Sequence, residues 1–380
     1  MRILVTGARG FVGKNLVAQL KNIRDGKATN YSISSISDIF EYDKEDTPEL
    51  LDLYTKKCDF VFHLAGVNRP KDIAEFTIGN FGFTSVLIDL LKKHNNKAPL
   101  LITSSIQATL DNPYGKSKKA SEDLIFTYGK EAGAKVLIYR LPNVFGKWCK
   151  PNYNSVVATF CHNIAHELPI IVNNPNTNME LVYIDDVVDE LIGALVGKEH
   201  KAGDTCYIAT TYKVKLGEIV DLLQGFKASR KSLTVPKLDN AFEKILHSTY
   251  LSYLPREQIV YSLKMREDAR GSFTEIVRTL DRGQFSVNIS NPGVIKGNHW
   301  HNTKNEKFVV VSGKALIQLR QIGSDEIINY HVNGKKIEVV DIPIGYTHNI
   351  INEGDTELIT FMWCNECFDP NKPDTYFEEV

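Results

Sequence analysis

The sequence lacks long hydrophobic runs. No segment reaches the roughly 18–20 consecutive apolar residues that a membrane-spanning helix needs, so we expect no membrane partner. The opening residues "MRILVTG" turn glycine-rich at once, without the apolar stretch and cleavage site of a secretory leader. Cysteine is also scarce: six are scattered over 380 residues, which favours a reducing, cytoplasmic location over a disulfide framework.

Neither sign of charge dominates the sequence. Lys and Arg number 45 against 46 Asp and Glu, and no basic stripe stands out, which argues against a nucleic-acid partner. Hydrophobic residues make up 43% and charged residues 24% of the chain, as in ordinary globular proteins. Because 380 residues exceed one ordinary core, we expect about two domains.

The pattern of apolar residues changes along the chain. As far as about residue 240, apolar strands alternate with amphipathic helices, which predicts a doubly wound parallel sheet of the Rossmann type. After about residue 265, short β-rich runs separated by turn residues predict an all-β sandwich or double-sheet barrel. We therefore predict domains at residues 1–250 and 251–380. The strands expected in the first are 2–6, 59–65, 99–105 and 135–140.

A glycine-rich turn follows the first predicted strand. In "TGARGFVG" the glycines are spaced GxxGxxG, which lets the backbone turn tightly and approach a pyrophosphate at a helix N-terminus. "HLAG" supplies a second glycine-bearing turn after another buried strand. The predicted contacts to a dinucleotide cofactor are Gly7, Arg9, Gly10, Phe11, Val12, Gly13, Leu64, Ala65, Gly66 and Ser104, with Tyr114 and Lys118.

Two side chains bear on the choice of nicotinamide. The Arg9 guanidinium lies within the glycine turn, where it could meet a 2′-phosphate. An acidic residue at the end of the second strand, for which Asp38 is a candidate, would instead favour NAD through the ribose hydroxyls. Because the pattern does not fix the end of that strand, we favour NADPH on the strength of Arg9 and keep NADH as the alternative.

The stretch "SSIQATLDNPYGKSK" carries candidate groups for carbonyl chemistry. Tyr114 and Lys118 are four residues apart and share one face of a helix. An ammonium near a phenol lowers the pKa of the phenol and makes it a usable proton donor or acceptor. Ser104 and Ser105 end the preceding strand, and either can donate a hydrogen bond to the carbonyl. Alone, such a pair is more often a surface feature; the glycine turn makes it a predicted reductase site.

Together these motifs resemble the extended short-chain dehydrogenase/reductase family, and specifically its nucleotide-sugar members. The resemblance covers most of residues 1–240 and includes "TGARGFVG", "HLAG", Asn80, "NPYGKSK", "RLPNVFG" and "LVYIDDVV". It implies that Ser105, Tyr114 and Lys118 are catalytic, with Ser104 as the fallback for Ser105. It also implies that Asn143 lines the nucleotide-sugar site.

The second region contains two histidine-bearing motifs. "GVIKGNHWHNTKNEKFVVVSG" places His299 and His301 on one face of a predicted strand, which suits a metal. Together with "PIGYTHNIIN" it resembles the two-part signature of the cupin family. The resemblance implies the metal ligands His299, His301, Glu306 and His348. Imidazoles with a carboxylate suit zinc, iron or manganese; a metal-free barrel that uses the histidines for acid/base work is the alternative.

A further resemblance concerns "DARGSFTE" and the stretch leading to His299. These residues look like those of nucleotide-sugar 3,5-epimerases of the cupin class. The resemblance implies that Arg270, Phe273 and Glu275 hold the nucleotide sugar and that His299 is the catalytic base. If His299 binds a metal instead, another acid/base group is needed; the candidates are Lys307, Tyr346 and His348.

Over its whole length the chain resembles bifunctional capsular-polysaccharide enzymes of the CapF type. The resemblance implies C3 epimerisation of a UDP-2-acetamido-2,6-dideoxy-4-keto-hexose in the cupin domain, followed by reduction at C4 with NADPH, towards UDP-N-acetyl-L-fucosamine. It also implies zinc and a homodimer. Because the ketone acidifies the C3–H bond and reduction removes the ketone, epimerisation must come first. The alternatives are a reductase whose barrel is only structural and, from another class, a non-enzymatic sensor of NADP(H) and a sugar.

Overall fold

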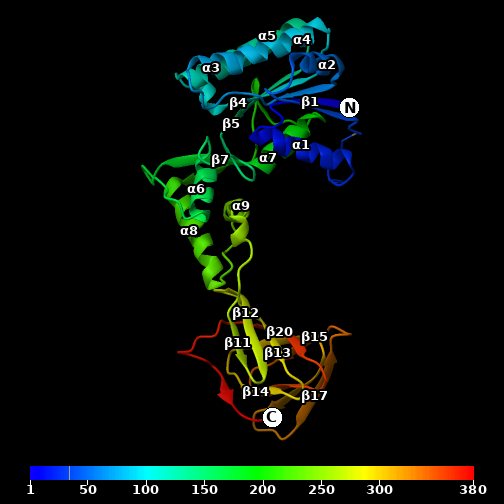
Figure 1. Ribbon diagram of the computed structural model, residues 1–380, viewed down its shortest axis with the longest axis vertical. Helices are drawn as coiled ribbons and strands as arrows, with labels where there is room; N and C mark the ends of the chain where they lie inside the picture. Colours follow the sequence, from blue (N-terminus) through cyan, green and yellow to red (C-terminus); the bar gives the residue numbers. More distant parts are fainter. Residues whose placement is uncertain (34) are drawn as a thin grey trace. The chain divides into compact units, whose positions relative to one another are not determined.

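The computed structural model describes residues 1–33 and 35–380 and divides the chain into two compact units (Figure 1). The first contains Met1–Gln224 and Asp239–Leu254, and the second contains Gly225–Leu238 and Pro255–Val380. The sequence predicts one boundary, at residues 250/251, whereas the chain passes between the units three times. Residues 225–238 join the second unit because their backbone pairs with Arg278: Val235 N donates to Arg278 O at 2.8 Å, and Arg278 N donates to Leu233 O at 2.9 Å.

A mostly parallel sheet in the order β2-β1-β3-β4-β5-β9-β8 forms the centre of the first unit. Strands β2, β1, β3, β4 and β5 pair in parallel with their neighbours, whereas β8 and β9 are antiparallel. The predicted doubly wound parallel sheet is confirmed. The bounds are β1 (Arg2–Thr6), β2 (Asp38–Tyr42), β3 (Phe60–His63), β4 (Leu100–Ser105), β5 (Val136–Leu141), β8 (Lys201–Ala202) and β9 (Thr205–Cys206).

Helices cover both faces of this sheet. In Figure 1, α4 (Phe83–Lys93) and α5 (Pro113–Ala132) lie on one face, and α1 (Phe11–Arg24) and α7 (Ile184–Ala194) lie on the other. Successive residues of β1 enter opposite cores: Ile3 and Val5 pack with Leu16 of α1, whereas Leu4 packs with Leu87 of α4. A strand buried on both faces reads as the near-continuous apolar run seen in the sequence.

A small sheet in the order β10-β7-β6 and further helices complete the first unit. The strands are β6 (Asn143–Phe145), β7 (Asn178–Tyr183) and β10 (Tyr212–Lys215). The helices of this region are α6 (Val156–Ala165), α8 (Leu216–Ser232), whose end lies in the second unit, and α9 (Ala241–Leu251); α2 (Pro48–Lys57) instead packs on the main sheet with α4. The short helical segments are α3 (Ala74–Phe76), η1 (Thr77–Gly82), η2 (Ile106–Thr109) and, in the second unit, η3 (Arg256–Gln258).

Two antiparallel sheets form the second unit, in the orders β11-β12-β13-β20-β15-β18 and β17-β16-β19-β14-β21. Alternate residues of β15 and β16, such as Phe308, Ile317 and Leu319, face a shared core. The predicted all-β double sheet is confirmed. The bounds are β11 (Met265–Asp268), β12 (Gly271–Thr279), β13 (Gly283–Ser290), β14 (Ile295–Trp300), β15 (Glu306–Ser312), β16 (Lys314–Gln321), β17 (Ile327–Asn333), β18 (Val339–Ile342), β19 (Tyr346–Asn352), β20 (Leu358–Cys364) and β21 (Tyr376–Phe377).

Within residues 1–33 and 35–380, none of the helices combines the length and the apolar character that crossing a bilayer would require.

Candidate active site and metal centre

The two glycine turns of the first unit pack against each other. Gly7 has φ +72°, and a Cβ there would lie 2.6 Å from the Ala65 backbone nitrogen. A Cβ on Gly13 would lie 2.1 Å from the Gly7 oxygen, and one on Gly66 would lie 2.9 Å from Lys118 Nζ. At Gly7 and Gly13 the atoms that a Cβ would meet belong to the backbone, so only glycine permits this spacing there. The two predicted cofactor turns therefore pack on each other, and the second lies beside the predicted catalytic Lys118 through Gly66.

The helix start beside the first turn is apolar. Phe11 and Val12 are the first residues of α1 and are half-buried. Together with Leu64 they pack against the core on the face of the sheet that α1 covers. Gly10 precedes the helix in extended conformation and carries no side chain that would cover the helix N-terminus. The backbone N–H groups at this end of α1 are thus available to a phosphate.

Acidic residues surround Arg9, which is itself exposed. Its guanidinium pairs with Asp46 at 2.9 Å and with Glu45 at 3.4 Å, and its backbone nitrogen donates to Asp43 at 2.8 Å. Asp38 is the first residue of β2, so it lies at the opposite end of that strand from the glycine turn. The acidic residue that follows the end of β2 is Asp43, which the sequence pattern did not single out.

Tyr114 and Lys118 occupy one face of α5, beside the end of β4. The Lys118 ammonium lies 6.0 Å from the centre of the Tyr114 ring and donates to the Thr103 carbonyl at 3.3 Å. Burial lowers the pKa of Lys118 to about 8, against the opposing charge of Glu122. Burial raises the pKa of Tyr114, and the hydrogen bond with Ser105 lowers it by less. The expected lowering of the phenol pKa is therefore wrong for this arrangement, because burial outweighs the polar neighbours.

The two candidate serines point to different surroundings. Ser105 caps η2 by accepting from Gln107 N at 3.1 Å, and its hydroxyl reaches Tyr114. Ser104 instead donates to Glu122 Oε1 at 2.6 Å. Glu122 is fully buried and pairs with Arg140, whose Nη2 lies 2.6 Å from Glu122 Oε2. Of the two, Ser105 is the hydroxyl on the Tyr114 side, and Ser104 belongs to a buried ion pair.

Asn80 joins the parts of this site, although the sequence singled it out only as part of a motif. It lies in the π-helical turn η1, a distortion that is frequent at functional sites. Its side chain accepts from Val67 N at 2.9 Å and donates to Ser117 Oγ at 2.9 Å. It thereby ties the "HLAG" turn to α5. Asn143, the predicted substrate contact, begins β6, is exposed and donates to Glu180 O at 3.3 Å.

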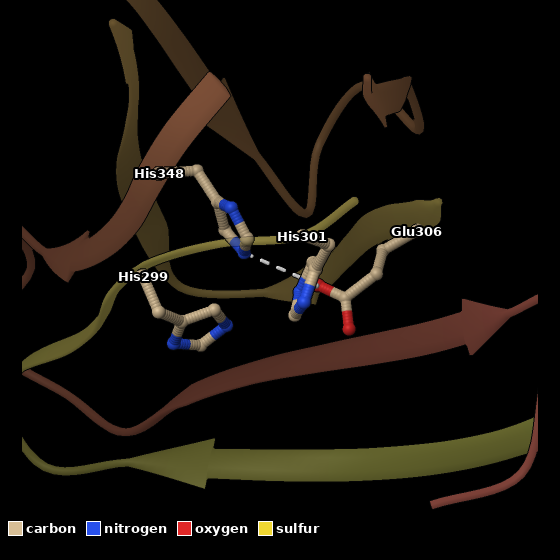
Figure 2. Close-up of side chains that lie close together, drawn as sticks. All are labelled: His299, His301, Glu306 and His348. Carbon is tan, nitrogen blue, oxygen red and sulfur yellow. Dashed lines mark ion pairs between the residues drawn. The ribbon is translucent and has the colours of Figure 1, made fainter. Parts of the chain in front are cut away.

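In the second unit, four predicted ligands converge (Figure 2). His299 lies on β14 opposite His348 on β19, His301 follows β14, and Glu306 begins β15. One ligand atom from each lies within 4.8 Å of the others. His348 Nε2 is 3.1 Å and His301 Nε2 is 3.7 Å from Glu306 Oε2. The pairing of β14 with β19, and the packing of these strands against β15 of the other sheet, thus bring residues that are far apart in sequence into one cluster.

The donor atoms of this cluster fit a divalent cation. His301 Nε2, His348 Nε2 and Glu306 Oε2 are buried and have no hydrogen-bond partner within residues 1–33 and 35–380. Buried polar atoms are normally paired, and a cation would satisfy all three. Burial opposes the charge on Glu306, yet His301 and His348 hold its pKa below the usual range. Burial also lowers the pKa of His299 to about 4, so a carboxylate and a neutral imidazole, both ligand forms, are present at neutral pH.

A cavity of about 1020 Å³ opens beside the cluster. His299, Glu306 and His348 line it together with the predicted substrate contacts Arg270, Phe273 and Glu275. Arg270 pairs with Asp268 at 2.7 Å, and Glu275 pairs with Arg278 at 2.5 Å. The walls also present basic residues, which suit a diphosphate. They are Lys264, Arg266, Arg270, Arg278, Lys296 and Lys304.

Two candidate acid/base residues lie elsewhere, and one cavity residue escaped prediction. Lys307 follows Glu306 on a strand, so its side chain points to the opposite face, where it pairs with Asp341. Tyr346 packs against the barrel core. Lys296 lines the cavity and donates to Asn288 Oδ1 at 2.8 Å; burial lowers its pKa. A β-bulge between Gly297 and His299 brings Lys296 and His299 to the same wall, and only Gly297 hints at this bulge in the sequence.

Comparisons with known proteins cover both units. Residues 3–209 match the NAD dependent epimerase/dehydratase family, and residues 266–376 match the polysaccharide biosynthesis C-terminal domain. The chain is similar to UDP-2-acetamido-2,6-beta-L-arabino-hexul-4-ose reductase of Pseudomonas aeruginosa, with 43% identity over 99% of this chain and 98% of that protein. It is also similar to UDP-glucuronate 4-epimerase 6 of Arabidopsis thaliana, with 25% identity over 62% of this chain and 63% of that protein.

Among solved structures, the capsular polysaccharide assembling protein CapF of Staphylococcus aureus matches with a TM-score of 0.92 and 54% identity, over 100% of both chains. A structure of CapF with the inhibitor 3-isopropenyl-tropolone matches with a TM-score of 0.87 and 50% identity, also over 100% of both chains.

Proposed function

We propose that this chain, which belongs to the NAD dependent epimerase/dehydratase family, is a nucleotide-sugar reductase of capsular polysaccharide synthesis that also epimerises its substrate. The substrate in this proposal is a UDP-2-acetamido-2,6-dideoxy-4-keto-hexose, on the route to UDP-N-acetyl-L-fucosamine. The observation that carries it is the presence, on one chain, of half-buried Tyr114 beside buried Lys118 and of a cavity lined by a His/Glu cluster.

The first unit would carry out the reduction at C4. A nicotinamide cofactor, when bound, supplies the hydride. Tyr114 gives its phenolic proton to the ketone oxygen, and its raised pKa keeps that proton in place until negative charge develops there. Ser105 donates a hydrogen bond to the same oxygen. The Lys118 ammonium stabilises the phenolate that remains.

We propose NADPH as the reductant, bound with Arg9 at the 2′-phosphate. Arg9 would then exchange its partner Asp46 for the phosphate. NADH is the second candidate, because Asp43 follows the end of β2, where an acidic side chain can accept from ribose hydroxyls. Initial rates with both cofactors separate the two. Arg9→Ala should raise KM for NADPH about tenfold and leave KM for NADH unchanged; an unchanged ratio would remove Arg9 from cofactor choice.

The second unit would carry out the epimerisation at C3. A divalent ion, when bound by His299, His301, Glu306 and His348, supplies a Lewis acid or a structural anchor. A base removes the C3 proton, the electron pair delocalises into the C4 carbonyl, and a proton returns to the opposite face of C3. His299 is the proposed base if it is not a ligand. The ammonium groups of Lys296 and Lys304 line the same cavity and can stabilise the enolate oxygen.

The test uses a UDP-4-keto-6-deoxy sugar in D₂O. Without NADPH, we expect deuterium to enter at C3, followed by NADPH oxidation once cofactor is added. Oxidation without exchange would leave a reductase with a structural barrel, and NADPH binding without either reaction would leave a sensor. Full exchange by His299→Ala would remove that residue from the proton transfer.

We further propose zinc as the bound ion and a homodimer as the assembly. Three imidazoles and one carboxylate suit zinc, and the wholly protein-derived ligand set resembles a closed structural site. Elemental analysis of the purified protein would identify the metal. Sedimentation equilibrium would give the mass of the assembly, and a mass near that of one 42.8 kDa chain would contradict the dimer.

A further inference from the structure

The segment 374–379, called the strap below, lies against the metal cluster. His301 Nδ1 is 2.5 Å from the backbone oxygen of Asp374. A carbonyl oxygen only accepts, so Nδ1 must carry the proton of the His301 ring. The neutral ring then keeps a lone pair on Nε2, the atom that faces the cluster without a hydrogen-bond partner in the described part of the chain. The strap therefore sets the tautomer that a metal ligand needs.

The carboxylate of Asp374 holds the loop that follows His301. Its Oδ2 accepts from Thr303 N at 2.9 Å, Thr303 Oγ1 at 3.1 Å and Lys304 N at 3.0 Å. Its Oδ1 accepts from Asn302 N and Asn302 Nδ2, both at 3.1 Å. One side chain thus fixes the backbone between two ligands, His301 and Glu306. Asp374 adopts φ +36°, and from this conformation its carbonyl contacts His301 and its carboxylate contacts the loop that follows.

The rest of the strap pairs with the strands that carry the other histidines. In β21, Phe377 pairs with His299 and Tyr376 with Trp300, and Glu378 N donates to Asn298 O at 3.0 Å. Thr347, next to His348, donates to the Glu378 carbonyl. The strap is therefore hydrogen-bonded to the backbone or the neighbours of all three histidines.

We propose that Asp374 is a positioning residue of the metal centre and that the strap is a component of the site. This inference rests on the proposed metal binding by the four-residue cluster. Asp374 acts through His301: its carbonyl fixes which ring nitrogen faces the metal, and its carboxylate fixes the loop that orients the ring. Losing an outer partner of this kind typically weakens metal binding about 10–100-fold.

The test measures zinc affinity of the full chain by competition with a chromogenic chelator. Asp374→Ala should weaken binding about 10–100-fold. Asp374→Asn, which tolerates the positive φ and keeps one acceptor oxygen, should lie between Ala and wild type. Asp369→Ala is the matched control, since that exposed carboxylate caps only Asn371 N within the described residues and should leave the affinity unchanged.

The visible spectrum of the Co²⁺-loaded protein supplies a second readout. If Asp374 orients His301, the ligand-field bands of Asp374→Ala at saturating Co²⁺ should differ from wild type, and those of Asp369→Ala should not. Zinc affinity within threefold of wild type in Asp374→Ala, or unaltered bands, would overturn the inference. NADPH affinity of each variant reports on the first unit, and a far-ultraviolet circular dichroism spectrum unchanged from wild type controls for misfolding of the second. Failure of the wild type to bind zinc would instead refute the proposed metal centre.

Discussion

The two candidate sites are built by different means. Tyr114 and Lys118 lie one turn apart on a single helix, and the glycine turns beside them come from strands of one parallel sheet. The cluster of the second unit draws on β14 and β19, which pair in antiparallel register, and on β15, which belongs to the other sheet. One site is set mainly by helical periodicity, and the other by strand pairing together with the packing of two sheets. Mutations should therefore act locally in the first site and cooperatively in the second.

The sites also differ in how their buried polar atoms are paired. Lys118 and Asn80 in the first unit are buried and hydrogen-bonded within the protein. In the second unit, His301 Nε2 and Glu306 Oε2 are buried without such partners in the described residues. The buried polar groups of the first site are thus paired within the protein. In the second site, buried ligand atoms lack a protein partner, and a cation would satisfy them.

The largest expected effect is that of Tyr114→Phe. Removing the phenolic proton should slow ketone reduction about 10²–10⁴-fold, the usual contribution of a general acid. The remaining ring keeps its contact with Phe76, whose centre lies 5.5 Å away. Deuterium exchange at C3, measured by mass spectrometry, should stay at the wild-type rate. A parallel loss of exchange would show that the two sites are not separable.

His348→Ala should disrupt the second site and spare the first. Removing a residue that only hydrogen-bonds a ligand typically weakens metal binding about 10–100-fold. Removing the ligand His348 itself should weaken zinc binding by more than this. Reduction of a ketosugar supplied already epimerised at C3 should continue unchanged. His331→Ala is the control, because that histidine is exposed on β17 and pairs with Glu353. Equal zinc loss in both variants would argue against the cluster.

Comparing Gly7→Ala with Gly26→Ala separates two costs in the first unit: the backbone strain of alanine at positive φ, and the steric clash of the added Cβ. Both glycines have φ near +70°, so alanine costs about 1–2 kcal/mol of unfolding free energy at either. A Cβ at Gly7 also meets Ala65 N at 2.6 Å, whereas at Gly26 nothing among the described atoms lies within 4 Å. Crowding should add about 1–3 kcal/mol at Gly7. Urea unfolding and NADPH affinity measure the difference, and equal losses would contradict the packing of the two turns.

The smallest effect is the pH dependence set by Lys118. Its pKa is lowered from 10.5 to about 8, so the ammonium is lost as pH rises through about 8. Reduction should fall about tenfold between pH 7 and 9, while C3 exchange should not follow this step. Between pH 8 and 10.5 the unfolded lysine binds more protons than the folded one, so this group makes stability rise with pH there. In Lys118→Met the step should vanish from the residual rate; its persistence would assign it to another group.

How much the sequence could predict depends on how far apart in the chain the interacting residues lie. The glycine turn and the Tyr114–Lys118 spacing are local, so they could be located before any fold was known. Strand periodicity singled out His299 and His301, but Glu306 and His348 could be named only through a family signature, since nothing local links them. Which of Ser104 and Ser105 faces Tyr114 depended on the buried pair of Glu122 and Arg140.

Other features depended on contacts that spacing does not encode. The role of Lys296 at the cavity depends on the bulge at Gly297. The contact of Asp374 with His301 spans about 70 positions of chain and has no periodic signal. The sign of the pKa shift at Tyr114 required knowledge of its burial, which a helix-face pattern does not give.

Residues 225–238 belong to the second unit, and this has a practical consequence for dividing the chain into fragments. A fragment cloned from Pro255 onward would omit the backbone that pairs with Arg278 and would remove Leu233 from the cavity wall. Conversely, a fragment ending at Gln224 would lose α9, which belongs to the first unit. No single cut yields two whole parts. A chimaera that takes one unit from a homologous protein would therefore need to keep residues 225–238 together with the barrel of residues 255–380.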